Sequence, residues 1–167
     1  MSASGDREKN RVKAGMLIEL AAAQDAKIIS LPQLFDTRWF PRDIDNSNFS
    51  LAEKEDGEAV TMLRERALRH AVVLIAPIFE EDNGEYFNTA FVIGPDGGII
   101  GKYRKIHVPQ IPLWEEKAYF APGNLGFPVF DTPFARIGVQ LCWDVFFPEG
   151  FRILALKGAE VVFAPTA

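Results

Sequence analysis

The sequence contains a single cysteine, Cys142, which excludes an intramolecular disulfide. It has no apolar run long enough to span a membrane, and residues 1–10 lack the apolar stretch of a signal peptide. The net charge is -5 and no basic stripe is present, which argues against nucleic acid as a partner. These absences predict a protein of the reducing cytoplasm with neither a nucleic-acid nor a membrane partner.

Cofactor motifs are also missing. The only histidines, His70 and His107, are far apart in sequence, so one cysteine and two histidines give no metal-ligand spacing. The glycines of residues 94–98 indicate a hairpin turn and not a strand-to-helix phosphate loop. We therefore expect no metal and no other cofactor.

The chain has 167 residues, of which 48% are hydrophobic, which predicts one domain, residues 1–167, with a sizeable core. Periodicity and turn residues predict an alternation of helices and strands, with two hairpins inserted. The expected helices are residues 6–25, 57–70 and 148–157, and the expected strands are residues 27–31, 71–79, 86–93, 99–103, 128–130, 135–141 and 160–163. This order indicates an α/β fold in which mixed sheet is layered on helices.

The first helix is predicted to be amphipathic, because its large apolar residues recur mostly every three or four positions. The residues expected on its apolar face are Val12, Met16, Leu17, Leu20 and Ala23. Residues 71–79 are almost continuously apolar, which is typical of a strand covered on both faces.

Both ends of the chain are unusual for such a layered fold. The chain opens on a helix without a preceding strand, and it closes directly after residues 160–163, an apolar strand expected to be buried. Counting layers predicts either a truncated chain or one whose sheet is covered by a partner, and we expect a homo-oligomer.

Cys142 follows an apolar strand and precedes a sharp turn and a helix start. A lone cysteine is most often a small core hydrophobe. A helix N-terminus, however, favours a thiolate, and the backbone N–H of Trp143 is placed to stabilise an oxyanion beside the sulfur. Cys142 is thus a candidate nucleophile that needs a base or a cation nearby.

Lys105 ends the strand of residues 99–103 and begins a long aromatic connection, residues 104–126. Basic runs are usually solvated. Strand alternation, however, places Lys105 and Tyr103 on one face and Arg104 on the other. A lysine that points into a pocket can stabilise both an oxyanion and a thiolate.

The general base is harder to assign. Gln33 lies where a strand ends in a loop, a suitable place for a carboxylate, but its amide does not accept a proton near neutral pH. Glu116 is the other candidate, with an exposed acidic turn as the competing interpretation. His107 is expected to be a structural hydrogen-bonding residue.

With these residues placed, the chain resembles the nitrilase (carbon–nitrogen hydrolase) superfamily. The matching stretches are residues 31–35, 101–107, 116–123, 138–144 with 147–149, and 158–167. The resemblance implies an α-β-β-α sandwich, normally formed by a much longer chain, with the first strand and most of the second half absent here. Within the superfamily these stretches are most similar to enzymes that act on N-carbamoyl amines and amino acids.

The resemblance also implies roles for the candidate residues. Cys142 matches the nucleophile, Lys105 the lysine that stabilises the tetrahedral intermediate, Glu116 a supporting glutamate, and Trp143 the donor of an oxyanion-hole amide. Gln33 stands where the family has its general-base glutamate. The implied function is hydrolysis of a small-molecule amide or N-carbamoyl group without a cofactor, and the alternative is an inactive ligand-binding or assembly module that retains the fold.

Overall fold

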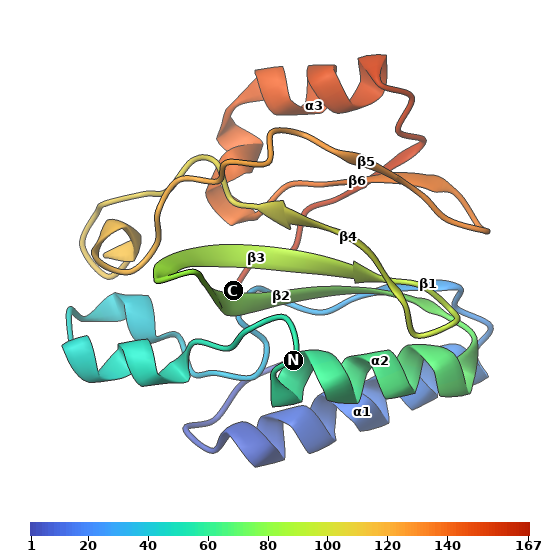
Figure 1. Cartoon of the computed structure of the whole chain (residues 1–167), viewed down its shortest axis with the longest axis horizontal. Coiled ribbons are helices and arrows are strands. Elements are labelled where there is room, and N and C mark those ends of the chain that lie inside the picture. The colour runs from blue at the N-terminus through green and yellow to red at the C-terminus, as the bar shows by residue number, and fades with distance from the viewer.

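The computed structural model describes all 167 residues as two β-sheets enclosed by helices (Figure 1). The first sheet has the order β1 (Ile28–Ser30), β2 (Val73–Asp82), β3 (Glu85–Ile93), β4 (Ile99–Arg104), and the second has β5 (Val129–Asp131), β6 (Arg136–Val139), β7 (Val161–Phe163). Helices α1 (Arg7–Ala23) and α2 (Glu58–His70) cover the first sheet, and α3 (Pro148–Leu156) covers the second. The predicted α-β-β-α sandwich is confirmed.

Strand pairing follows the predicted hairpins. Strand β1 pairs parallel to β2, whereas β2–β3 and β3–β4 are antiparallel. The β2–β3 turn is tighter than predicted, because Asn83 and Gly84, with φ of 53° and 83°, form a two-residue hairpin loop. The strands consequently run to Asp82 and from Glu85, where the sequence indicated a turn over residues 80–85.

Three hydrophobic clusters form the core. The first lies between the helices and the first sheet, and the second lies between the two sheets. Strand β2 contributes to both, which confirms that it is covered on both faces. The third cluster is aromatic: Phe40 and Phe49 pack on Phe79 and Tyr119. The loop after β1 is therefore folded against the sheet.

The apolar face predicted for α1 is wrong. Val12, Met16 and Leu20 are exposed by 57%, 65% and 55%, and the buried residues are instead Asn10, Ala14, Gly15 and Ile18. The reason is close packing: a Cβ on Gly15 would lie 3.1 Å from the Arg66 guanidinium of α2. Small residues allow the two helices to approach, and the larger apolar side chains remain on the solvent face.

The predicted burial of the last strand is also wrong. Val161 is exposed by 43%, and its two neighbours in β7 are only partly buried. Strand β7 pairs with β6 on one side and forms the edge of the second sheet. None of the helices has the length and apolar character needed to cross a membrane.

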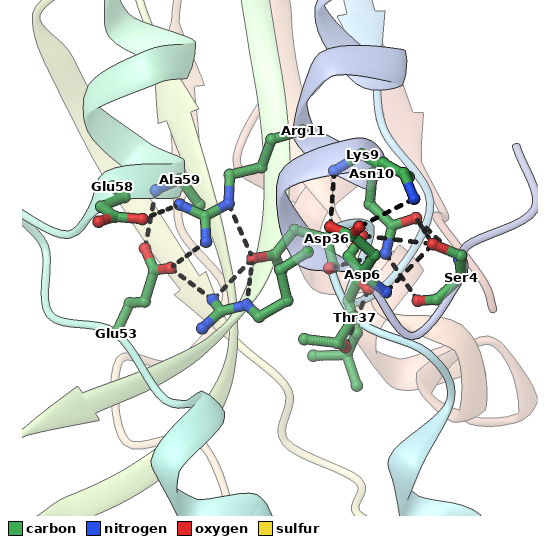
Figure 2. A network of polar contacts seen from close by, with 12 residues as sticks. Ser4, Asp6, Lys9, Asn10, Arg11, Asp36, Thr37, Glu53, Glu58 and Ala59 are labelled. Atoms are coloured by element: carbon green, nitrogen blue, oxygen red, sulfur yellow. Dashed lines mark hydrogen bonds and ion pairs between the residues drawn. The ribbon is translucent and has the colours of Figure 1, made fainter.

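A polar network fixes the loop that follows β1 (Figure 2). Arg7 of α1 donates from Nε and Nη2 to the buried carboxylate of Asp36, at 3.1 and 2.7 Å, and it also binds Glu53. The side-chain amide of Asn10 donates to the backbone oxygen of Asp36 at 3.0 Å. These bonds tie α1 to the segment that carries Gln33.

Candidate active site

Cys142 lies just beyond β6, at the start of a short 3-10 helix, Cys142–Phe146, and α3 begins only at Pro148. Its φ is 46°, in the left-handed region that L-residues seldom adopt. Its backbone N–H donates to the oxygen of Pro165 at 3.1 Å, which helps to hold this conformation. The thiol is therefore carried on a sharp turn, where it is partly buried.

Burial raises the pKa of the Cys142 thiol above its ordinary value. The Lys105 ammonium and the Trp143 backbone N–H lower that pKa, but the carboxylates of Glu116 and Asp144 act in the opposite direction. The sequence predicted a helix terminus that favours the thiolate. In the structure α3 begins only at Pro148, and burial, the largest influence on this thiol, raises its pKa.

Lys105 and Glu116 form a buried ion pair. Lys105 Nζ lies 2.8 and 2.6 Å from the two carboxylate oxygens of Glu116, and both side chains have no solvent exposure. Burial raises the pKa of Glu116, although the Lys105 charge opposes the shift. The solvated basic run and the exposed acidic turn are thus both excluded as descriptions of these residues.

Gln33 is buried, with 3% of its surface exposed, and neither atom of its side-chain amide has a hydrogen-bond partner. Its backbone N–H donates to the oxygen of Thr166 at 3.2 Å. Cys142 binds the preceding residue, Pro165, so the 165–166 segment connects the two turns. Buried polar atoms without partners are uncommon in folded proteins, which makes this amide a candidate to bind a ligand.

A cavity of about 280 Å³ opens beside Gln33, with Arg38 and Trp39 in its wall. Cys142 does not line this cavity. Its size suits a small organic molecule and not a macromolecule.

Two backbone hydrogen bonds, one from the N–H and one to the oxygen of Lys105, fix the start of the connection that follows β4. The backbone N–H of Lys105 donates to the oxygen of Asn88, and its oxygen accepts from Gly123 at 2.8 Å. The neighbouring Arg104 donates to the buried carboxylate of Glu80 at 2.8 Å. Lys105 and Arg104 therefore point to opposite sides of the strand, as alternation predicted.

Two residues at the site were not singled out from the sequence. Asp144 is fully buried and accepts hydrogen bonds from Leu141, just beyond β6, and from Tyr103 and His107 of residues 103–107, the lysine segment. Asn88 is buried next to Glu116, and its side-chain amide has no partner of good geometry. His107 places Nδ1 2.8 Å from Asp144 and stacks on Phe147, which confirms its structural role. In the sequence, Asn88 and Asp144 resemble any polar residue next to an apolar strand.

The arrangement brings together a thiol, a buried ammonium group and a carboxylate. Such a set can form a covalent bond from sulfur to an electrophilic carbon and stabilise the negative charge that develops on the attached oxygen. The uncharged amide of Gln33 can hydrogen-bond to a ligand, but it cannot remove the thiol proton near neutral pH.

The chain is similar to known proteins over its whole length. The carbon–nitrogen hydrolase family matches residues 1–167. The chain is 44% identical over 159 residues to a nitrilase of Pyrococcus abyssi, and 39% identical over 163 residues to N-carbamoylputrescine amidase of Solanum lycopersicum. These alignments cover 95% and 97% of the chain but only 58% and 54% of the relatives, so the chain spans little more than half of their length.

Solved structures show the same fold. A carbon–nitrogen hydrolase from Helicobacter pylori G27 superposes with a TM-score of 0.94 at 36% identity, over 99% of this chain and 57% of that one. A glutamate-to-glutamine variant of the amidase from Nesterenkonia sp. AN1 superposes with a TM-score of 0.84 at 26% identity, over 99% and 61%. With the family match over its entire length, the chain belongs to the carbon–nitrogen hydrolase family.

Proposed function

We propose that this protein hydrolyses a non-peptide C–N bond, in an amide or N-carbamoyl group of a small molecule, through Cys142. The observation that carries the proposal is the sealed Lys105–Glu116 pair, whose ammonium group is close enough to favour the Cys142 thiolate. An isolated core cysteine needs no such partner.

In the proposed reaction the Cys142 sulfur attacks the carbonyl carbon, and the thiol proton passes to the departing nitrogen. Lys105 and the Trp143 N–H stabilise the oxyanion of the tetrahedral intermediate. The C–N bond then breaks, ammonia leaves, and water hydrolyses the remaining thioester to regenerate the thiol. An N-carbamoyl amine would yield ammonia, carbon dioxide and the free amine.

Gln33 limits this reaction because the proton transfer needs a base. General acid–base catalysis typically contributes about 10²–10⁴-fold in rate, and a loss of this order is expected unless Glu116 substitutes. The glutamine variant of the Nesterenkonia amidase shows covalent addition of the acetamide moiety of fluoroacetamide at its active-site cysteine. That adduct supports the idea that a glutamine-bearing site of this fold retains a nucleophilic cysteine.

The proposed substrate class is N-carbamoyl amines, with N-carbamoylputrescine as the first compound to test. The proposal is supported by the similarity to N-carbamoylputrescine amidases of several plants, including Arabidopsis thaliana, at 39% identity.

The test is ammonia release from N-carbamoylputrescine and propionamide by the parent chain, Gln33→Glu and Cys142→Ala. We expect Gln33→Glu to exceed the parent by about 10²-fold or more, because the variant restores a proton acceptor. Cys142→Ala should release no ammonia. If Gln33→Glu is no faster than Cys142→Ala, the assignment of these catalytic residues is wrong.

The alternative is an inactive ligand-binding or assembly module, and the uncharged Gln33 is the observation that favours it. Isothermal titration of N-carbamoylputrescine separates the two functions. Binding by both the parent and Gln33→Glu, with no turnover by either, would establish the binding module.

We also propose a homo-oligomer in the reducing cytoplasm. The exposed apolar residues of α1, namely Val12, Met16 and Leu20, support self-association, because contiguous apolar surface is usually covered. A monodisperse monomer in light scattering at micromolar concentration would contradict the oligomer.

A further inference from the structure

We infer that Asp144 is a positioning residue that fixes Lys105 against Cys142, an inference that rests on the proposed function of those two residues. Asp144 lies two residues after the nucleophile, in the 3-10 helix Cys142–Phe146. Its side chain is fully buried and does not reach solvent.

The four hydrogen bonds that Asp144 accepts connect two segments distant in sequence. Oδ2 accepts from the Leu141 backbone N–H at 3.0 Å and from the Tyr103 hydroxyl at 2.8 Å. Oδ1 accepts from the backbone N–H and Nδ1 of His107, both at 2.8 Å. Leu141 immediately precedes Cys142.

The lysine segment is thereby held on both sides of Lys105, since Tyr103 and His107 are each two residues from it. Tyr103 remains a hydroxyl donor, because burial and the adjacent Asp144 charge raise its pKa far above neutrality. His107 is held further by stacking on Phe147, with ring centroids 3.7 Å apart. One carboxylate therefore bridges the segment of the nucleophile and the segment of the cation.

The negative charge of Asp144 does not by itself favour the Cys142 thiolate. A carboxylate at this position raises the pKa of Cys142 and also that of Glu116. Its favourable contribution is therefore geometric: it keeps Lys105 and the Trp143 N–H around the same reacting atom. Cys142, with its left-handed φ, requires such support.

The first test measures alkylation of Cys142, the sole cysteine, by iodoacetamide against pH, followed by intact mass. This readout does not require turnover. If Asp144 acted only through its charge, Asp144→Asn would move the alkylation midpoint to lower pH. The positioning role predicts a rise of about one pH unit, because a displaced Lys105 no longer favours the thiolate. An unchanged or lowered midpoint would overturn the inference.

The second test measures acylation by p-nitrophenyl acetate, which forms an oxyanion, whereas alkylation forms none. In this step sulfur bonds to the acetyl carbon, p-nitrophenolate leaves, and the thiol proton goes to solvent. We expect acylation by Asp144→Asn to fall by about 10²-fold, far more than alkylation at a pH where the thiol is ionised. Equal losses in both rates, matched by a lower melting temperature, would show a merely structural role and overturn the inference.

Two controls keep the outcomes distinct. Asp131→Asn removes an exposed carboxylate of β5 and should change neither rate.

If Asp144→Asn does not fold, Tyr103→Phe tests the inference instead. It removes one of the four hydrogen bonds to Asp144 and should raise the alkylation midpoint by a smaller amount. Its matched control is Tyr86→Phe, whose hydroxyl lies outside this network, and equal behaviour of the two variants would overturn the inference. A parent that is alkylated but never acylated would contradict the proposed function and leave the midpoint test valid.

Discussion

Lys105 Nζ contacts both carboxylate oxygens of Glu116, at 2.8 and 2.6 Å, and neither side chain is exposed to solvent. Two charges this deeply buried stabilise each other only as long as both are present. The pair therefore links the stability of the fold to the composition of the candidate active site.

Removing one partner of this pair should be costly. We expect Glu116→Gln to lower the free energy of unfolding by about 3–5 kcal/mol, because Lys105 is left buried without a counter-charge. The measurement is urea denaturation followed by circular dichroism. Lys105→Met alone and the double variant Lys105→Met/Glu116→Gln complete the cycle, and the double variant should lose less than the sum of the two single variants; strictly additive losses would contradict the coupling.

The pH dependence of Cys142 reactivity should reflect its burial. Because burial raises the pKa of this thiol, its alkylation by iodoacetamide should have a midpoint above that of N-acetylcysteine measured in parallel. Reactivity at neutral pH should accordingly be low in the absence of substrate. A midpoint at or below that of the free thiol would show that Lys105 and the Trp143 N–H dominate the local field instead.

The Glu80 cluster should make stability depend on acid. Burial alone would raise the pKa of Glu80, but hydrogen bonds from Arg104, Lys102 and Thr89 lower it below the ordinary value of 4.5. The stabilisation is thus present above pH 4.5 and is lost as the pH falls through the lowered pKa of the folded state.

The corresponding variant is Glu80→Gln, which we expect to lose about 3 kcal/mol at pH 7 because Arg104 loses its buried partner. Thermal melts from pH 7 down to pH 3 should show the parent and the variant converging in acid. Glu85→Gln, an exposed residue at the start of β3, should melt like the parent throughout. A stability difference that stays constant with pH would exclude the ionised carboxylate as its cause.

Gly123 should be intolerant of any side chain. A Cβ at this position would lie 2.1 Å from the backbone oxygen of Arg104, and the Gly123 N–H donates to the oxygen of Lys105. We expect Gly123→Ala to cost about 1–3 kcal/mol and to slow acylation of Cys142, since the lysine segment must move. Gly5→Ala, with no atom within 4 Å of the added Cβ, is the matched control and should be neutral in both measurements.

Local patterns predicted most of the elements but not every buried face. Alternation and turn residues identified β2, β3 and β4 to within a few residues, because strand period and hairpin chemistry are properties of neighbouring residues. The buried face of α1 was assigned wrongly because the hydrophobicity of a helix does not indicate how closely another helix packs against it. Gly15 beside Arg66 is a contact between two helices, and neither helix shows it separately.

The candidate site divides in the same way. The sequence by itself determined that Cys142 follows an apolar strand, that Lys105 and Glu116 lie within one long connection, and that Gln33 bears no charge. Only the tertiary structure decided that the ion pair is sealed from solvent, that the thiol has a raised pKa, and that Asp144 joins the two segments. Burial and long-range hydrogen bonds depend on how the two sheets are packed together, and a pKa follows from that environment and not from the identity of the residue.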